Sequence, residues 1–230
     1  MSAVPPEADT LSGVTRTREQ ARAAYDRISR WYDLVEGMWE QKARSFGLSK
    51  LPVHEGETVL EIGFGTGHSL VALARGVGMT GRVFGVDLSP GMVGVTRSRL
   101  RARGLSDRVP LVCADATSLP YAPCSFDAVF MSFVLELFDT PEIPVVLEQC
   151  RMALRDGGHV CVVALSRCGG LSWMGRLYEW GHLRFPWLLD CRLIHVRAAL
   201  AGAGFAIADA SLISLFGLPV EVVLARKPAG

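Results

Sequence analysis

The sequence predicts an α/β fold with one mostly parallel sheet, an antiparallel last strand and helices on both faces. Two observations support this prediction. Apolar runs of strand length alternate with stretches long enough for a helix, which is typical of parallel strands joined by right-handed crossovers. Near the carboxyl end, the apolar runs 206–215 and 219–226 are separated by a connection too short for a crossover, so this pair is expected to be antiparallel.

Size and composition agree with this class. A chain of 230 residues suits one α/β domain with added segments, and its 50% hydrophobic content is enough for a buried core. The formal charge of +1 gives no electrostatic support for a nucleic-acid partner. The longest apolar stretches are shorter than the roughly 18 residues that span a bilayer, and the amino terminus lacks a signal pattern, so a cytoplasmic location is expected.

The six cysteines form no Cys-x-x-Cys pair and have no clustered histidine partners. No zinc or other metal site is therefore expected. Several of them lie within apolar strand patterns, which favours buried small side chains in a reducing compartment. They are Cys113, Cys124, Cys150, Cys161, Cys168 and Cys191.

The segments before the first strand divide into two parts. Residues 1–15 contain Pro5, Pro6 and Gly13 without periodicity and are expected to form a flexible tail. From Thr17 to Phe46, apolar residues recur at three- and four-residue spacing, which predicts a helical arm within residues 16–50. The main domain is expected over 51–230.

The strands and helices of the main domain follow in alternation. The helix after the first strand is expected over about 68–76. A second helix opens at Ser89 and Pro90 and runs to about Gly104, with Ser89 as N-cap and Pro90 at the first helical position. The strands before the final pair are expected at 58–62, 82–86, 109–113, 126–131 and 158–165.

Residues 166–195 fit no strand and are expected to form a cap. This segment holds three of the five tryptophans, together with several arginines. Each aromatic side chain by itself is expected to pack the cap onto the sheet. As a group they indicate an apolar pocket or a surface that touches a membrane.

The end of the first predicted strand carries a glycine-rich turn. Glu61 ends an apolar run, and glycines then stand at every second position through Gly67. Glycine allows positive φ and close approach of a ligand to the backbone. A dinucleotide-binding turn requires Gly-x-Gly-x-x-Gly, but here the third glycine comes one place early and His68 stands where glycine is needed. Glu61 would repel a pyrophosphate yet could accept hydrogen bonds from an ammonium group.

The heptapeptide Glu61-Ile62-Gly63-Phe64-Gly65-Thr66-Gly67 resembles motif I of the class I S-adenosylmethionine-dependent methyltransferases. Asp87 ends the second strand 20 residues after Gly67, the spacing at which an acid can bind both ribose hydroxyls. The resemblance implies that an acid at Asp115 holds the adenine amino group. Residues 125–130 and 154–163 are similar to the family's fourth strand and to its entry into the fifth. The implied fold is a Rossmann-like seven-stranded methyltransferase sheet.

The predicted arm is similar to that of particular members of this family. Residues 25–33, Tyr-Asp-Arg-Ile-Ser-Arg-Trp-Tyr-Asp, are similar to the arm of the ubiquinone/menaquinone C-methyltransferases and of the bacterial phosphatidylethanolamine N-methyltransferases. The resemblance implies that Tyr25 and Tyr32 contact the amino acid end of the cofactor, where a ring over a sulfonium gains cation–π energy. A packed amphipathic helix is the alternative for these two residues.

The resemblance implies S-adenosyl-L-methionine as cofactor and in-line methyl transfer, which mainly requires alignment. A base is needed only if the acceptor must lose a proton. Glu136 and His182 are the candidate catalytic residues, with Asp139, His68 and His195 behind them. A surface carboxylate or a structural ion pair is the alternative for Glu136. The expected cofactor contacts are Tyr25, Tyr32, Glu61, Gly63, Phe64, Gly65, Thr66, Gly67, Asp87, Leu88, Met92, Asp115, Ala116 and Ser132.

The aromatic cap favours a small hydrophobic acceptor, either quinol-like or a phospholipid head group, and peripheral membrane contact. One alternative is a cofactor-binding sensor or scaffold without transfer activity. Another is a nicotinamide-dependent dehydrogenase, against which Glu61, His68 and the antiparallel final pair all argue. The acceptor atom and the oligomeric state are left open.

Overall fold

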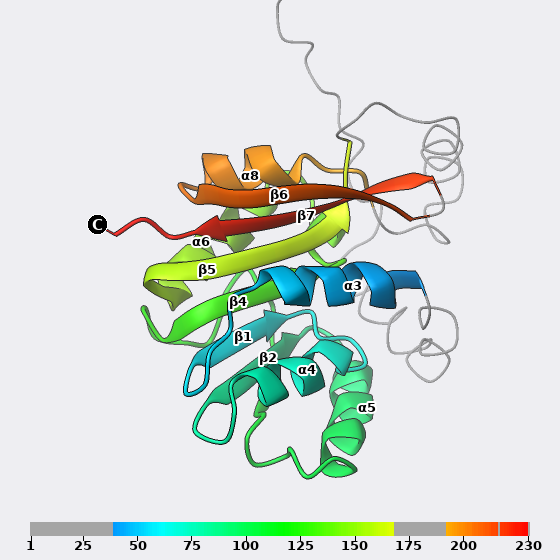
Figure 1. The fold of residues 1–230 in the computed structure, drawn as a ribbon, viewed down its shortest axis with the longest axis vertical. Coiled ribbons are helices and arrows are strands. Elements are labelled where there is room, and N and C mark those ends of the chain that lie inside the picture. Colours follow the sequence, from blue (N-terminus) through cyan, green and yellow to red (C-terminus); the bar gives the residue numbers. More distant parts are fainter. Residues whose placement is uncertain (1–38, 168–191, 216, 230) are drawn as a thin grey trace, which may run out of the picture.

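The computed structural model describes residues 39–167, 192–215 and 217–229, and these form a seven-stranded sheet with the order β3-β2-β1-β4-β5-β7-β6 (Figure 1). The first five strands are mutually parallel, whereas β7 runs antiparallel to both β5 and β6. This confirms the predicted fold class. The strands are β1 (Thr58–Ile62), β2 (Arg82–Asp87), β3 (Leu111–Cys113), β4 (Phe126–Ser132), β5 (Leu154–Leu165), β6 (Ala206–Leu215) and β7 (Leu218–Arg226).

Two strands differ from their predicted bounds by more than one residue. β3 starts at Leu111 instead of residue 109, because Pro110 has no N–H group and only its carbonyl joins β2, accepting from Gly85 N at 3.0 Å. β5 starts four residues early, at Leu154, where it pairs with Phe126 before the register shifts.

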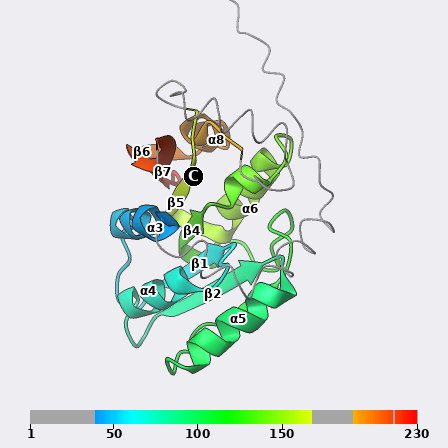
Figure 2. The same cartoon turned by 90° about the vertical axis from the view of Figure 1, so that its right-hand side faces the viewer.

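The helices cover both faces of the sheet. Apolar residues of α3 (Trp39–Lys50), α4 (His68–Gly76) and α5 (Pro90–Arg101) share one core cluster, and those of α6 (Ile143–Ala153) and α8 (Val196–Gly202) share the other. Figure 2 shows α3 and α4 on one side of the sheet and α6 and α8 on the other. The molecule is therefore a three-layer α/β structure in the described part of the chain.

The predicted starts of the helices after β1 and β2 are confirmed. α4 has the expected bounds, and Ser89 caps α5 by accepting from Met92 N at 3.1 Å. α5 ends at Arg101, and the chain then turns through Gly104 at φ 66. α3 continues to Lys50, beyond the expected end at Phe46. The rest of the predicted arm and the tail lie outside the described residues.

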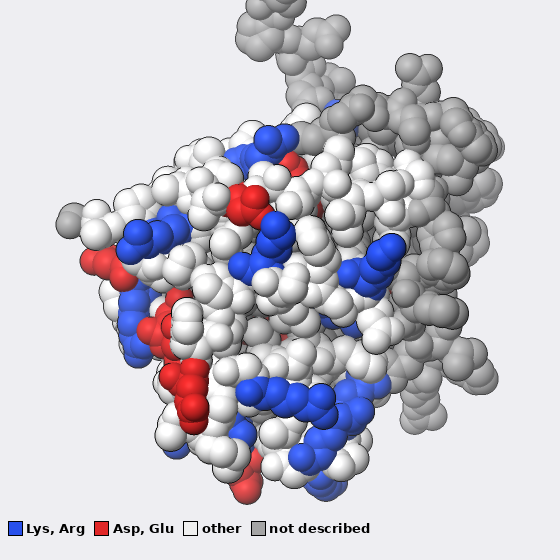
Figure 3. Space-filling view, in the orientation of Figure 1, with Lys and Arg blue, Asp and Glu red and all other residues white. Residues whose placement is uncertain are grey.

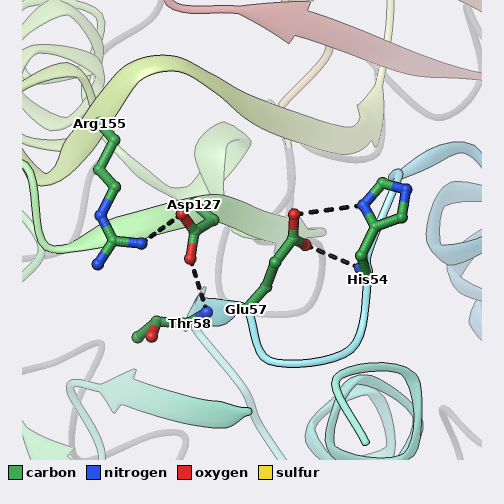
Figure 4. A network of polar contacts seen from close by, with 5 residues as sticks. All are labelled: His54, Glu57, Thr58, Asp127 and Arg155. Atoms are coloured by element: carbon green, nitrogen blue, oxygen red, sulfur yellow. Dashed lines mark hydrogen bonds and ion pairs between the residues drawn. The ribbon is translucent and has the colours of Figure 1, made fainter. Parts of the chain in front are cut away.

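Polar contacts fasten the amino ends of two central strands (Figure 4). Asp127, near the start of β4, accepts from Thr58 N at the start of β1 at 2.8 Å and also pairs with Arg155. Beside them, Glu57 accepts from His54 N at 2.8 Å. These groups hold the amino ends of β1 and β4 in register, while the glycine turn lies at the carboxyl end of β1.

Charged side chains are unevenly distributed on the face shown in Figure 3, where lysines and arginines gather over α4 and α5. Residues 75–108 contain seven arginines and two aspartates. Two of these arginines bind backbone carbonyls in or next to α4: Arg99 contacts Thr66 O, and Arg108 contacts Ala74 O and Gly78 O. These two arginines therefore tie the backbone around α4 in place.

The described cysteines follow the prediction only in part. Cys150 and Cys161 are buried, as expected, but Cys113 and Cys124 are exposed, so the prediction is wrong for these two. Cys113 is exposed because β3 is the edge strand. Within the described ranges, no group of three metal-binding side chains was found, and no helix has the length and apolar character to cross a bilayer.

Candidate functional site

The glycine turn follows β1 and has the backbone conformation that its sequence predicts. Gly63, Gly65 and Gly67 have φ values of 67°, 50° and 80°. A Cβ on Gly63 would lie 2.2 Å from a methyl group of Val134, and one on Gly67 would lie 2.5 Å from Thr96 Cγ2. A Cβ on Gly65 would meet no atom of the described residues within 4 Å. Packing therefore requires two of the glycines, while the third leaves open space before the turn.

Neighbouring elements hold this turn rigidly. Asp87, at the end of β2, accepts from Gly65 N through Oδ2 and from Ser89 N through Oδ1, both at 2.9 Å. From α5, Thr96 Oγ1 donates to Gly65 O at 2.7 Å. Sequence reasoning found Asp87 but missed Thr96 and Arg99, because their contacts with the turn depend on how α5 packs against it.

Glu61 lies buried at the end of β1, with 2% of its surface exposed. Burial raises its pKa to about 8, while a hydrogen bond to Ser69 and the charge of Arg44 lower it. Its Oε2 atom has no hydrogen-bond partner among the described residues. A buried carboxyl oxygen without a partner is costly, which indicates that a polar ligand completes it. Sequence reasoning missed Arg44, which reaches Glu61 only through the packing of α3.

Asp115 stands beyond the end of β3 and is half-buried. Its Oδ1 atom accepts from both Thr117 N and Thr117 Oγ1, each at 2.8 Å. This local turn fixes the loop beside Ala116, whose side chain is buried, and Leu88 lies half-buried after β2. Glu61, Asp87 and Asp115 thus lie at or just beyond the carboxyl ends of three adjacent parallel strands.

Other predicted contact residues have buried side chains. Phe64 and Met92 belong to the core cluster beneath α4 and α5, and Thr66 is also buried. Only the backbone at Phe64 and Met92 is therefore left for contact with a cofactor. Tyr25, Tyr32 and His182 lie outside the described residues.

The carboxyl end of β4 contains two further buried polar groups. Ser132 Oγ has no partner among the described residues, and Phe133 follows with φ 56°, which is strained for a residue with a Cβ. Glu136 has 0% exposure and accepts from Leu165 N at 3.2 Å through Oε1. The alternative that Glu136 is a surface carboxylate is therefore wrong. His68 and His195 are exposed, and Asp139 is half-buried.

The ends of the predicted cap lie side by side. Ser166 and Ile194 form an isolated parallel bridge outside the named strands, which joins the two ends of this segment. Arg192 is buried and donates to Thr140 Oγ1 at 3.1 Å and to the carbonyl of Phe138. The segment 168–191 lies outside the described residues.

The sheet order, the reversed β7 and the glycine turn together define a domain with the class I methyltransferase fold. Residues 59–158 match the family model described as "Methyltransferase domain".

Two curated relatives extend this match. The chain is 29% identical over 163 residues to a demethylmenaquinone methyltransferase of Porphyromonas gingivalis, covering 67% of this chain and 64% of that protein. It is 32% identical over 150 residues to one of Geobacillus stearothermophilus, covering 65% and 62%. The match thus spans less than two thirds of the length of either relative.

Solved structures share the fold. The [4+2]-cyclase SpnF superposes with a TM-score of 0.74 at 21% identity, over 94% of this chain and 98% of that one. Geranyl diphosphate C-methyltransferase of Streptomyces coelicolor A3(2), in complex with Mg²⁺, geranyl diphosphate and S-adenosyl-L-homocysteine, gives 0.65 at 16% identity, over 82% and 80%.

Proposed function

We propose that this chain binds S-adenosyl-L-methionine at the carboxyl ends of β1, β2 and β3 and transfers its methyl group to a small hydrophobic acceptor. The observation that carries the proposal is the buried Glu61 carboxyl, whose Oε2 atom has no partner among the described residues. It lies next to a turn that leaves open space at Gly65. This donor set fits the cofactor, because a buried carboxylate pairs well with an ammonium group.

Each acid of the site has a separate binding role in this proposal. Glu61 accepts hydrogen bonds from the ammonium group at the amino acid end of the cofactor. Asp87 binds the ribose hydroxyls from the end of β2, where its two oxygens also hold the backbone N–H groups of Gly65 and Ser89. Asp115 holds the adenine amino group. The rigid turn between them leaves the backbone little freedom to lose on binding.

The chemistry requires alignment more than bond-making by the protein. When bound, S-adenosyl-L-methionine supplies an electrophilic methyl group on a sulfonium. The chain's own part is to hold the cofactor against the glycine turn, to place the acceptor in line with the methyl carbon and to exclude water. The remaining proposed contacts are those of Tyr25 and Tyr32, the backbone of Phe64 and Met92, and Gly63, Gly65, Thr66, Gly67, Leu88, Ala116 and Ser132.

The acceptor proposed is quinol-like, with a phospholipid head group as the other candidate. The curated relatives named as demethylmenaquinone methyltransferases support the quinol class. The aromatic residues of 166–195 suit an apolar acceptor that partitions into membranes.

A sensor or scaffold that binds the cofactor without transfer is the second candidate function. The fold by itself does not require methyl transfer, since a protein named as a [4+2]-cyclase shares it. The two candidates differ in whether a labelled methyl group moves. Labelled S-adenosyl-L-methionine incubated with the protein and a lipid extract will label the lipid fraction if the transferase proposal holds. Label confined to aqueous metabolites contradicts the hydrophobic acceptor, and no transfer favours the sensor.

Isothermal titration tests cofactor choice directly. We expect wild-type protein to bind S-adenosyl-L-methionine and not NAD(H), and Asp87→Ala to weaken binding by at least about 10-fold, since a hydrogen-bonded charged group contributes about 1.5–3 kcal/mol. Asp107→Ala, which alters an exposed aspartate away from the turn, serves as the control. Tight NAD(H) binding would refute the assignment.

A further inference from the structure

A short turn after β4 carries a buried acid next to the glycine turn. The turn is η1 (Leu135–Leu137), and Glu136 is its central residue, with 0% exposure. Val134, directly before it, packs against Gly63, where an added Cβ would lie 2.2 Å from Val134 Cγ2. The backbone that positions Glu136 is therefore in contact with the proposed cofactor site.

The same acid is tied to the base of the cap. Glu136 Oε1 accepts from Leu165 N, the last residue of β5, at 3.2 Å. The carbonyl of Leu165 accepts in turn from Ile194 N at 3.1 Å, where the chain returns from the cap. Glu136 thus lies between the glycine turn on one side and both ends of segment 166–195 on the other.

The second oxygen of the Glu136 carboxyl group is Oε2, which is buried and accepts no hydrogen bond from the described residues. The same holds for Ser132 Oγ on β4 and Glu61 Oε2 on β1. These two strands are direct neighbours in the sheet. Three unpartnered polar atoms near the same strand ends indicate that polar ligand groups complete them.

We propose that Glu136 is a catalytic residue that accepts, at Oε2, the proton that the methyl acceptor loses. This role rests on the proposed methyl transfer. A hydroxyl or N–H group of the acceptor hydrogen-bonds to Oε2. The acceptor atom forms its bond to the methyl carbon, the carbon–sulfur bond breaks with its electron pair going to sulfur, and the acceptor's proton passes to Glu136. Release of that proton to water restores the carboxylate.

The basicity of Glu136 suits this role. Burial raises its pKa to about 8, and the backbone N–H groups of Leu165 and of Glu136 itself lower it. A general base works best when its pKa lies near the working pH. A sulfonium bound at the adjoining turn would favour the ionised form, because an opposite charge nearby stabilises a carboxylate.

The test variant is Glu136→Gln. Its amide oxygen can still accept from Leu165 N, so the link to the cap base is kept, but the side chain can no longer take up a proton. Glu148→Gln, which alters a half-buried carboxylate on α6, is the matched control. Affinity for S-adenosyl-L-methionine is measured by isothermal titration. Turnover is measured with labelled cofactor on two probes, chemically reduced 1,4-naphthoquinone and phosphatidylethanolamine vesicles.

We expect Glu136→Gln to keep cofactor affinity within about twofold and to lose at least about 100-fold in turnover, the usual contribution of a general base. The wild-type kcat/KM should rise towards a pH of about 8, whereas the variant should show no such rise. The control should match wild type in every measurement. A purely structural role would leave the pH profile unchanged in shape.

Infrared spectroscopy gives a readout that needs no turnover. At pH 6.5 the wild type should show a protonated carboxyl C=O band that Glu136→Gln lacks and that disappears at high pH. Glu61→Gln is needed beside it, because burial also raises the pKa of Glu61 to about 8. If Glu136→Gln does not fold, Glu136→Asp replaces it, with a smaller loss of turnover expected. Absence of the Glu136 band would overturn the proposal.

The outcomes separate the two proposals. If wild-type protein does not bind S-adenosyl-L-methionine, the proposed function is refuted. If it binds and transfers, but Glu136→Gln turns over equally fast, only the role of Glu136 is refuted. If it binds the cofactor and methylates neither probe, transfer to these acceptor classes is refuted together with the role of Glu136.

Discussion

Replacing Glu61 by glutamine should make the free protein more stable at neutral and alkaline pH. Burial raises the pKa of this carboxyl from 4.5 to about 8 in the folded state. Between these two values the folded protein holds a proton that the unfolded chain has released, so stability falls as pH rises. The slope is about 1.4 kcal/mol per pH unit and levels off above pH 8. The full cost of the buried carboxylate is about 5 kcal/mol.

The assay is urea unfolding of wild type and Glu61→Gln at pH 6, 7 and 8. The difference in unfolding free energy between the two should grow by about 2 kcal/mol from pH 6 to pH 8, in favour of the variant. Any pH-independent cost of the buried amide cancels in this comparison. Glu148→Gln is the control: Arg151 lowers the pKa of half-buried Glu148, so its effect is confined to acid pH. A difference that stays constant within about 0.5 kcal/mol would refute the reasoning.

Three further predictions follow from the packing. Gly67→Ala should lower stability by about 1–3 kcal/mol, because its Cβ would lie 2.5 Å from Thr96 Cγ2 at a φ of 80°. Gly94→Ala lies in α5, where the added Cβ would meet no described atom within 4 Å, and should instead stabilise the protein by about 0.5–1 kcal/mol. Thermal melts in which Gly67→Ala proves more stable than Gly94→Ala would contradict this prediction. Among the described cysteines, Cys113 and Cys124 should react with a thiol reagent in the native state, while Cys150 and Cys161 should react only after unfolding, since burial raises both pKa values to about 12; peptide mass mapping decides. Asp127→Asn should lower the free energy of unfolding by about 1–2 kcal/mol. It should leave cofactor affinity unchanged, because Asp127 lies at the amino ends of the strands and the proposed cofactor site lies at their carboxyl ends. A weakened affinity in titration would contradict this separation.

Most of the fold that could be predicted follows from sequence signals within a few residues of each other. The apolar runs gave the strands, Ser89 and Pro90 marked the start of α5, and the short connection before β7 required an antiparallel pair. Each of these signals depends on neighbours within a few residues. The errors occurred where longer-range pairing decides a boundary, as at Leu154, which joins β5 only because Phe126 lies beside it.

For the candidate site, the sequence alone predicted the glycine turn and the acids Glu61, Asp87 and Asp115, because these residue types at this spacing are typical of a nucleoside-binding turn. Tertiary structure alone decided what surrounds them. Thr96, Arg99 and Arg44 reach the turn or Glu61 from helices remote in sequence, and Glu136 proved buried instead of exposed. The physical reason is that burial and hydrogen-bond completion depend on the packing of helices onto the sheet, which no local pattern records.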